Sequence, residues 1–260
     1  MWLQPMVNLF KMDFRRFISN KMMYVLLMVF SAFQIFGIFM INQYEEPTEH
    51  GGLLTSAMNE SQFIQSMLAQ TPSWVMIYIA VFTVYFYMSE YNSGFYKNYI
   101  TLSRARINSV LSKILIQGVF TLFIFVVFIL SDLIGRTIFF EQATIGDIGY
   151  FVKLLIGQIV LHWSFSIMIL CITIIMRNII ASIVISIALV LNVFGMVLGV
   201  LESLITDLNL TSYLLVNTIT NRTIDFNNLG DFIHVFSVAI IVMLVFSLIA
   251  LNYKIREDLR

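Results

Sequence analysis

The side chains best suited to catalysis or metal binding are few and scattered in this sequence. Its 260 residues include three His (His50, His162 and His234) and one Cys, Cys171. No His-Glu-x-x-His or Gly-x-Ser-x-Gly pattern occurs, so the motifs of zinc proteases and serine hydrolases are missing. His162, inside an apolar run, is interpreted as a hydrogen-bonded interior residue, with a metal or proton role as the alternative. Cys171 is interpreted as a small apolar filler. We therefore predict neither a catalytic site nor a metal site.

A phosphate-binding loop is also missing. None of the twelve Gly residues is followed by Lys, so the Gly-x-x-x-x-Gly-Lys-Ser/Thr pattern that cradles ATP phosphates does not occur. The net charge is zero, which gives no indication of a nucleic-acid partner. We predict no cofactor in this chain, and any ATP and Mg²⁺ that it depends on would be bound by another polypeptide.

The polar segment Ser89–Lys113 has the spacing of a protein-binding element. Gly94 permits a sharp turn, and Ser93 can cap the helix that follows. Phe95 and Tyr99 are aromatic residues among bases, an arrangement that suits a short helix docking into a groove of another protein. The alternative is a basic loop that only sets the orientation of the chain in a membrane.

The elements that must position this segment are membrane spans. The sequence is 59% hydrophobic and 12% charged, with a mean hydropathy of +0.89, and its apolar runs are long enough to cross a bilayer. We predict an all-α integral membrane protein with six transmembrane helices. Their expected ranges are 22–41, 73–88, 110–134, 150–176, 179–201 and 232–251. Spans four and five are separated only by Arg177 and Asn178, which predicts a hairpin there.

The distribution of basic residues predicts the orientation. Twelve of the fifteen Lys and Arg residues fall before the first span, around the segment 89–113, at Arg177 and in the C-terminal tail. The side with more bases is cytoplasmic. We therefore expect both termini in the cytoplasm of a multi-pass plasma-membrane protein.

Three segments outside the spans are also expected to be structured. Residues 3–21 have aromatic and basic residues on opposite faces, which predicts a helix in the lipid interface; a solvated flank is the alternative. The outer loop from Asn42 to Pro72 is expected to contain a short helix. The segment 202–231 is too apolar for a free loop, and we expect a partly re-entrant pair of short helices there.

The run Glu90-x-x-Ser93-Gly94-x-x-Lys97-Asn98, followed by Ser103-Arg104 and Ser112-Lys113, resembles the first cytoplasmic loop of ABC-2 type exporter permeases. It is most similar to the small six-span permeases that act with separate ATPases on lantibiotics, bacitracin-like antibiotics and cytolytic peptides. Phe95 replaces the Thr usual in that pattern, and Thr101 stands where Pro is often found.

The resemblance implies a non-catalytic permease subunit, a separate ABC ATPase, a second permease copy that is identical or different, and a peptide or lipophilic antibiotic as cargo. Residues 89–109 would form the coupling loop with a cytoplasmic coupling helix between spans two and three. The implied ATPase-coupling residues are Glu90, Ser93, Gly94, Phe95, Lys97, Asn98, Tyr99, Ser103 and Arg104. We expect Glu90 to pair with Arg104 or Lys113, and we expect Glu90→Lys to leave membrane insertion intact while it impairs coupling.

Polar residues within the spans are candidates for a translocation path. Gln34, Gln117 and Asn192 could line it, but a lone amide in hydrocarbon more often forms an interhelical hydrogen bond. Asp132 is expected to reach water from the outer end of its span. The scarcity of charge at mid-membrane argues against a channel or secondary transporter, which remains the alternative function together with a non-transporting scaffold.

Small residues in the fifth span suggest close helix packing. Gly195 and Gly199 are four residues apart, and Ser182 and Ser186 precede them with the same spacing. Such spacing lets helix backbones approach closely. The stripe could pack within the monomer. The resemblance, in which spans one and five meet across a dimer, implies a dimer interface instead.

Overall fold

The structure is a computed structural model that describes residues 3–44, 57–95, 103–140, 144–205 and 210–256. Those residues form α-helices and one short 3₁₀ helix, with no β-strand among them. The elements are α1 (Leu3–Ile18), α2 (Lys21–Tyr44), α3 (Glu60–Leu68), α4 (Trp74–Asn92), α5 (Ser103–Phe139), α6 (Ile148–Met176), α7 (Ile179–Val190), α8 (Val193–Ile205), η3 (Thr211–Tyr213), α9 (Leu215–Thr220) and α10 (Leu229–Ile255).

Five of these helices (α2, α4, α5, α6 and α10) are long and apolar enough to cross a membrane. The helices α7 and α8 together qualify as a sixth span, but they are bent by 48° at a short break. This agrees with an all-helical, multi-pass membrane protein. The continuous fifth span expected over 179–201 is corrected, because Asn192 adopts a left-handed backbone with φ of 55° and ends the helical run.

The hairpin expected between the fourth and fifth spans is present. Arg177 ends α6 in a left-handed conformation with φ of 51°. Asn178 then caps α7, since its side-chain oxygen accepts a hydrogen bond of 3.1 Å from the backbone N–H of Ala181. Two adjacent residues therefore reverse the chain and begin the next helix.

The core of the bundle is formed by α4 and α6, whose apolar residues are largely covered by other helices. Helices α5, α7 and α10 pack around α6, and α2 packs against α5. The apolar residues of α2 and α10 remain largely exposed, as in Met28 and Leu248. Because water would penalise such surface, these two helices have the composition expected of lipid-facing spans.

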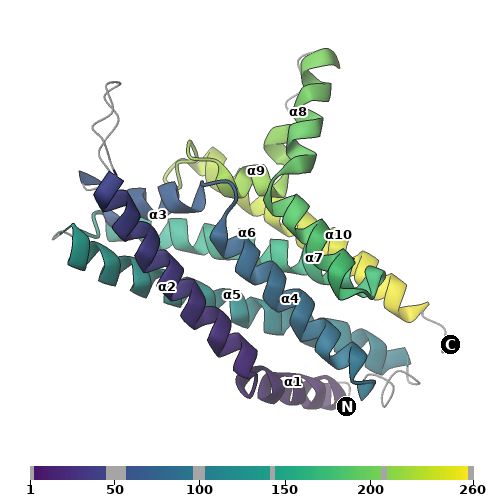
Figure 1. Cartoon of the computed structure of the whole chain (residues 1–260). Coiled ribbons are helices and arrows are strands. Elements are labelled where there is room, and N and C mark those ends of the chain that lie inside the picture. The colour runs from purple at the N-terminus through teal and green to yellow at the C-terminus, as the bar shows by residue number, and fades with distance from the viewer. Residues whose placement is uncertain (1–2, 45–56, 96–102, 141–143, 206–209, 257–260) are drawn as a thin grey trace.

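The two ends of the bundle carry different elements (Figure 1). Helix α1 lies at one end, together with the C-terminal ends of α4 and α10, whereas α3 and α9 lie at the other end and α8 projects away from the bundle. The expected amphipathic helix is present as α1, which buries Phe17 against the rings of Phe82 and Phe86 and leaves Arg15 exposed.

The short helix expected in the first outer loop is α3. It begins with a capping box, in which the Asn59 side chain accepts from the backbone of Gln62 and the Gln62 side chain accepts from the backbone of Asn59. The segment expected to be partly re-entrant contains η3 and α9 among its described residues. Residues 206–209 within it lie outside the described residues.

Candidate functional site

The end of α4 forms a turn that presents an exposed aromatic residue. Gly94 has φ of 70°, so the turn expected from the glycine is present in the left-handed region. Phe95 follows it and is 43% exposed. Ser93 is the C-cap of α4, and its hydroxyl donates a 2.9 Å hydrogen bond back to the carbonyl oxygen of Glu90. The helix that Ser93 was expected to cap falls on residues 96–102, outside the described residues, so that role stays a prediction.

Part of the expected coupling loop lies outside the described residues. Lys97, Asn98 and Tyr99 belong to this undescribed part. Ser103 and Arg104 begin α5, but their side chains are not described. Residues 103–109, expected to belong to the loop 89–109, are therefore the first turns of α5.

Glu90 anchors the turn in the bundle through buried ion pairs. Only 4% of Glu90 is exposed, and its carboxylate accepts a 3.0 Å hydrogen bond from the Lys113 ammonium of α5. The expected contact between Glu90 and Lys113 is thus present. The guanidinium of Arg16, from α1, also donates to this carboxylate. One carboxylate therefore joins three helices.

Asp13 completes this cluster from α1. It is fully buried, accepts a 2.6 Å hydrogen bond from the Ser112 hydroxyl, and lies 3.8 Å from the Lys113 ammonium. Arg16 donates to the carbonyl oxygen of Phe86 at 2.9 Å and covers its ring at 4.1 Å. The coupling cluster, defined as Asp13, Arg16, Glu90 and Lys113, pairs two buried carboxylates with the buried Lys113 and the partly exposed Arg16.

Sequence reasoning missed Asp13 and Arg16. A signal was present, because Asp13 is the one acidic residue within the otherwise basic segment 3–21 and precedes Arg16 by one helical turn. Nothing in the sequence, however, shows that α1 folds onto α4 and α5.

The geometry connects the turn to the rest of the bundle. The carboxylate of Glu90 lies one helical turn before Gly94, and its ion pairs join the end of α4 to Lys113 of α5 and to Arg16 of α1. The described residues contain no group of three or more His, Cys, Asp or Glu arranged to hold a metal ion.

The chain matches the family model described as "ABC-2 family transporter protein" over residues 9–195. It belongs to this family. The match begins within α1 and extends into α8, so it includes all four residues of the coupling cluster. Members are transmembrane components of ABC transporters and are not themselves catalytic. No curated protein matches the chain.

The three candidate path residues of this ABC-2 permease all form hydrogen bonds between elements. Gln34 of α2 donates to Asp132 of α5 at 3.3 Å. Gln117 accepts a 2.8 Å hydrogen bond from Thr83, and Asn192 donates to Asn217 of α9. These contacts agree with the interpretation that the three amides form hydrogen bonds between packed elements. Gln34 also lines a pocket.

The candidate dimer residues of the permease pack largely within the single chain. Ser182 and Ser186 are fully buried in α7, which packs against α4 and α6. Gly195 is buried beside the Asn192 side chain, which lies 2.1 Å from the position of an added Cβ. Gly199 faces Thr211, whose methyl carbon lies 3.8 Å from such a Cβ. The dimer interface at this stripe stays a prediction, since α8 leaves Met196 and Val200 largely exposed.

At the α3 end, the permease buries a second set of charges. Arg136 donates to Glu60 at 2.6 Å and also to the carbonyl oxygen of Met58, and both charged side chains are fully buried. Asp132, one turn before Arg136, is fully buried as well. The expectation that Asp132 reaches water is wrong, because α3 packs on this end of α5.

His162 is an interior residue of the permease, as expected. It is fully buried, its Nδ1 lies 2.8 Å from the carbonyl oxygen of Gln158, and its ring packs edge-on against Phe125.

Proposed function

We propose that this chain is the permease subunit of an ABC exporter that works with a separate ATPase subunit bound at the turn after α4. The observation that carries this proposal is the coupling cluster. It fixes the base of the turn to two other helices through ion pairs of the buried Glu90, while Phe95 beyond it stays exposed. A loop that only set orientation would need basic residues, but no buried carboxylate at its base.

In this proposal, two ATPase subunits bind ATP and Mg²⁺ and close on each other. Their closure displaces the turn after α4 in each of two permease copies. Because Glu90 holds both α1 and α5, the interfacial helix and the third span would move with the turn. The cargo class, amphipathic peptides or lipophilic antibiotics moved out across a bacterial plasma membrane, rests on the resemblance of the 90–113 segment to small antibiotic exporters.

One observation favours the alternative of a secondary transporter, namely the burial of Asp132 in a membrane span. However, Asp132 lies near the end of α5, where Gln34 donates to it, one turn from the buried Arg136–Glu60 pair. The packing of α3 on α5 accounts for its burial, so we propose no second function.

Phe95→Ala is expected to weaken ATPase binding about tenfold, because truncating an aromatic anchor at an interface costs roughly 1–2 kcal/mol. The measurement is co-purification of the ATPase and its cargo-stimulated rate. Phe36→Ala removes a still more exposed aromatic residue from α2 and should leave both unchanged. Wild-type binding and coupling by Phe95→Ala would show that the turn does not dock the ATPase.

Cysteine labelling tests the orientation that the proposal requires. The native Cys171 is buried, so its own labelling adds little to the signal from an introduced cysteine. Thr71→Cys and Arg222→Cys, both exposed at the α3 end, should react with an impermeant maleimide on intact cells, since that end is proposed to face outward. Lys11→Cys and Arg256→Cys should react only after the cells are opened. The reverse pattern would place the coupling cluster outside the cell and contradict the proposal.

A further inference from the structure

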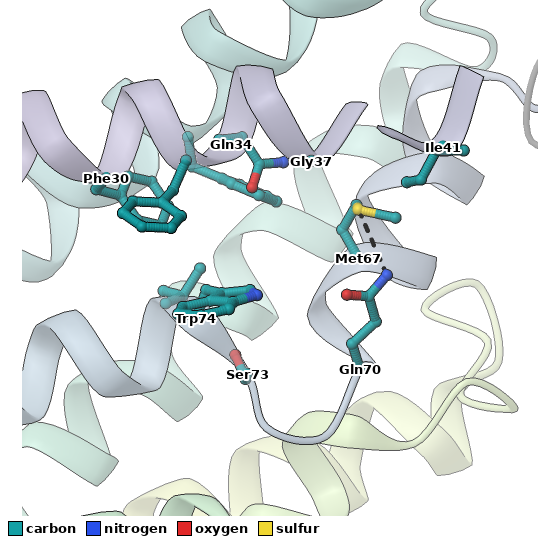
Figure 2. A pocket seen from close by; sticks show the side chains of 11 residues that line it. Phe30, Gln34, Gly37, Ile41, Met67, Gln70, Ser73 and Trp74 are labelled. Atoms are coloured by element: carbon teal, nitrogen blue, oxygen red, sulfur yellow. Dashed lines mark hydrogen bonds between the residues drawn. The ribbon is translucent and has the colours of Figure 1, made fainter. Parts of the chain in front are cut away.

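A pocket of about 150 Å³ lies between α2 and the start of α4, at the α3 end of the bundle (Figure 2). Phe30, Phe33, Trp74 and Phe128 give it aromatic walls. A cavity of this size lined by apolar side chains accepts a benzene-sized group. The pocket is distinct from the coupling cluster, which lies at the other end of the bundle.

Ser73 places an unused hydroxyl in this pocket. It occupies the N-cap position of α4, where a serine side chain normally accepts a hydrogen bond from the first turn of the helix, yet it makes no such bond. Ser73 is 1% exposed, and its hydroxyl has no hydrogen-bond partner among the residues that the structure describes. Figure 2 shows this oxygen directed into the pocket. A buried hydroxyl without a partner is costly, so a ligand would satisfy it.

Two amides complete the polar part of the lining. Gln34 uses its amide nitrogen to donate to Asp132, and its carbonyl oxygen faces the pocket (Figure 2). Gln70 makes one weak contact of 3.7 Å from its amide nitrogen to the sulfur of Met67. Among the described residues, no Lys, Arg, Asp or Glu lines the pocket. The lining therefore suits an uncharged group that donates and accepts hydrogen bonds.

The pocket is bordered by residues that also face the lipid. Phe33 and Trp74 stack with their ring centroids 5.6 Å apart, and each is about half exposed, at 50% and 48%. Both lie on helices that are candidate spans. The exposed edge of the pocket therefore lies on the surface of two candidate spans rather than in the interior of the bundle.

We propose that this pocket binds a neutral amphiphile from the bilayer through a ring that carries a hydroxyl group, a phenol-like group. The ring occupies the aromatic walls, and its hydroxyl bonds with Ser73 and Gln34. The proposal concerns binding alone and is independent of the ATPase, so its failure would leave the proposed transport function untouched.

Binding of 4-fluorophenol tests this inference, measured by ¹⁹F NMR with the full chain in lipid nanodiscs and corrected against empty nanodiscs. We expect saturable binding that is roughly fivefold to tenfold tighter than that of fluorobenzene, which lacks the hydroxyl. Gly37→Leu should abolish the saturable binding of 4-fluorophenol. Gly37 lines the pocket with no atom within 4 Å of an added Cβ, so the larger side chain can fill the space without a clash at that carbon. Met28→Leu, on the exposed face of α2, is the matched control and should bind like wild type.

Ser73→Ala separates a ligand site from a helix cap. We expect its 4-fluorophenol affinity to fall to that of fluorobenzene while its melting temperature stays at or above that of wild type, since no capping bond is lost. A lower melting temperature with unchanged phenol binding would overturn the proposal, as would saturable binding that persists in Gly37→Leu. Tighter binding of 4-fluorobenzylammonium than of 4-fluorophenol would overturn the assignment of an uncharged ligand.

Discussion

Replacing Glu90 by Lys is expected to destabilise the permease and to abolish its coupling to the ATPase. The substitution would put three cations (Arg16, Lys113 and the new Lys) around the single carboxylate of Asp13 in a buried site. Breaking a buried ion pair costs roughly 3–5 kcal/mol, which corresponds to a fall of roughly 10 °C in melting temperature. We therefore replace the expectation from sequence, in which this variant leaves membrane insertion intact and impairs only coupling, by one in which it also loses stability.

Thermal unfolding in nanodiscs and co-purification with the ATPase measure the two effects of Glu90→Lys. Glu90→Gln is the milder control, because an amide oxygen can still accept from Lys113 while the charge is lost. The swap Glu90→Lys with Lys113→Glu should recover only part of the stability, since the new Lys would face Arg16. A melting temperature for Glu90→Lys equal to that of wild type would show that the cluster does not hold the three helices together.

Features governed by local chemistry were predictable from the sequence. The long apolar runs predicted the helices that can span a membrane, because the required length follows from bilayer thickness. Gly94 predicted the turn, since a left-handed backbone favours glycine. Glu90 was expected to seek a base nearby in the chain, and Lys113 lies on the adjacent helix.

Features that depend on tertiary packing were missed or wrong. The pairing of Asp13 and Arg16 with the α4–α5 junction joins residues far apart in the sequence, and no local pattern encodes it. Asp132 was expected to reach water because of its place near a span end, but the packing of α3 reverses that. The bend at Asn192 was hidden in a continuous apolar run, since its partner Asn217 lies in a distant segment.

Arg136 connects α3 to the rest of the bundle, a role that its position near the end of a span does not indicate. This side chain is fully buried, donates to Glu60 and to the carbonyl oxygen of Met58, and lies 4.8 Å over the ring of Phe63. It is therefore both the charge partner and the hydrogen-bond donor for the start of α3. Asp132 lies one turn away on the same helix, so the loss of Arg136 would leave buried carboxyl groups without their cation.

Arg136→Met is expected to cost roughly 3–5 kcal/mol, because Glu60 would remain buried without its partner. The double variant Arg136→Met with Glu60→Met should recover only part of this loss, since apolar residues can replace the buried ion pair at little cost but Asp132 stays buried without the cation. Thermal unfolding of wild type, both single variants and the double variant gives the coupling energy. Thr71→Cys labelling checks whether α3 stays packed, because release of α3 should speed the reaction in the single variants. If the stability losses of the two single variants simply add up in the double variant, Arg136 and Glu60 do not act as a pair. The docking of α3 would then be due only to its apolar contacts, such as those of Phe63 and Ile64.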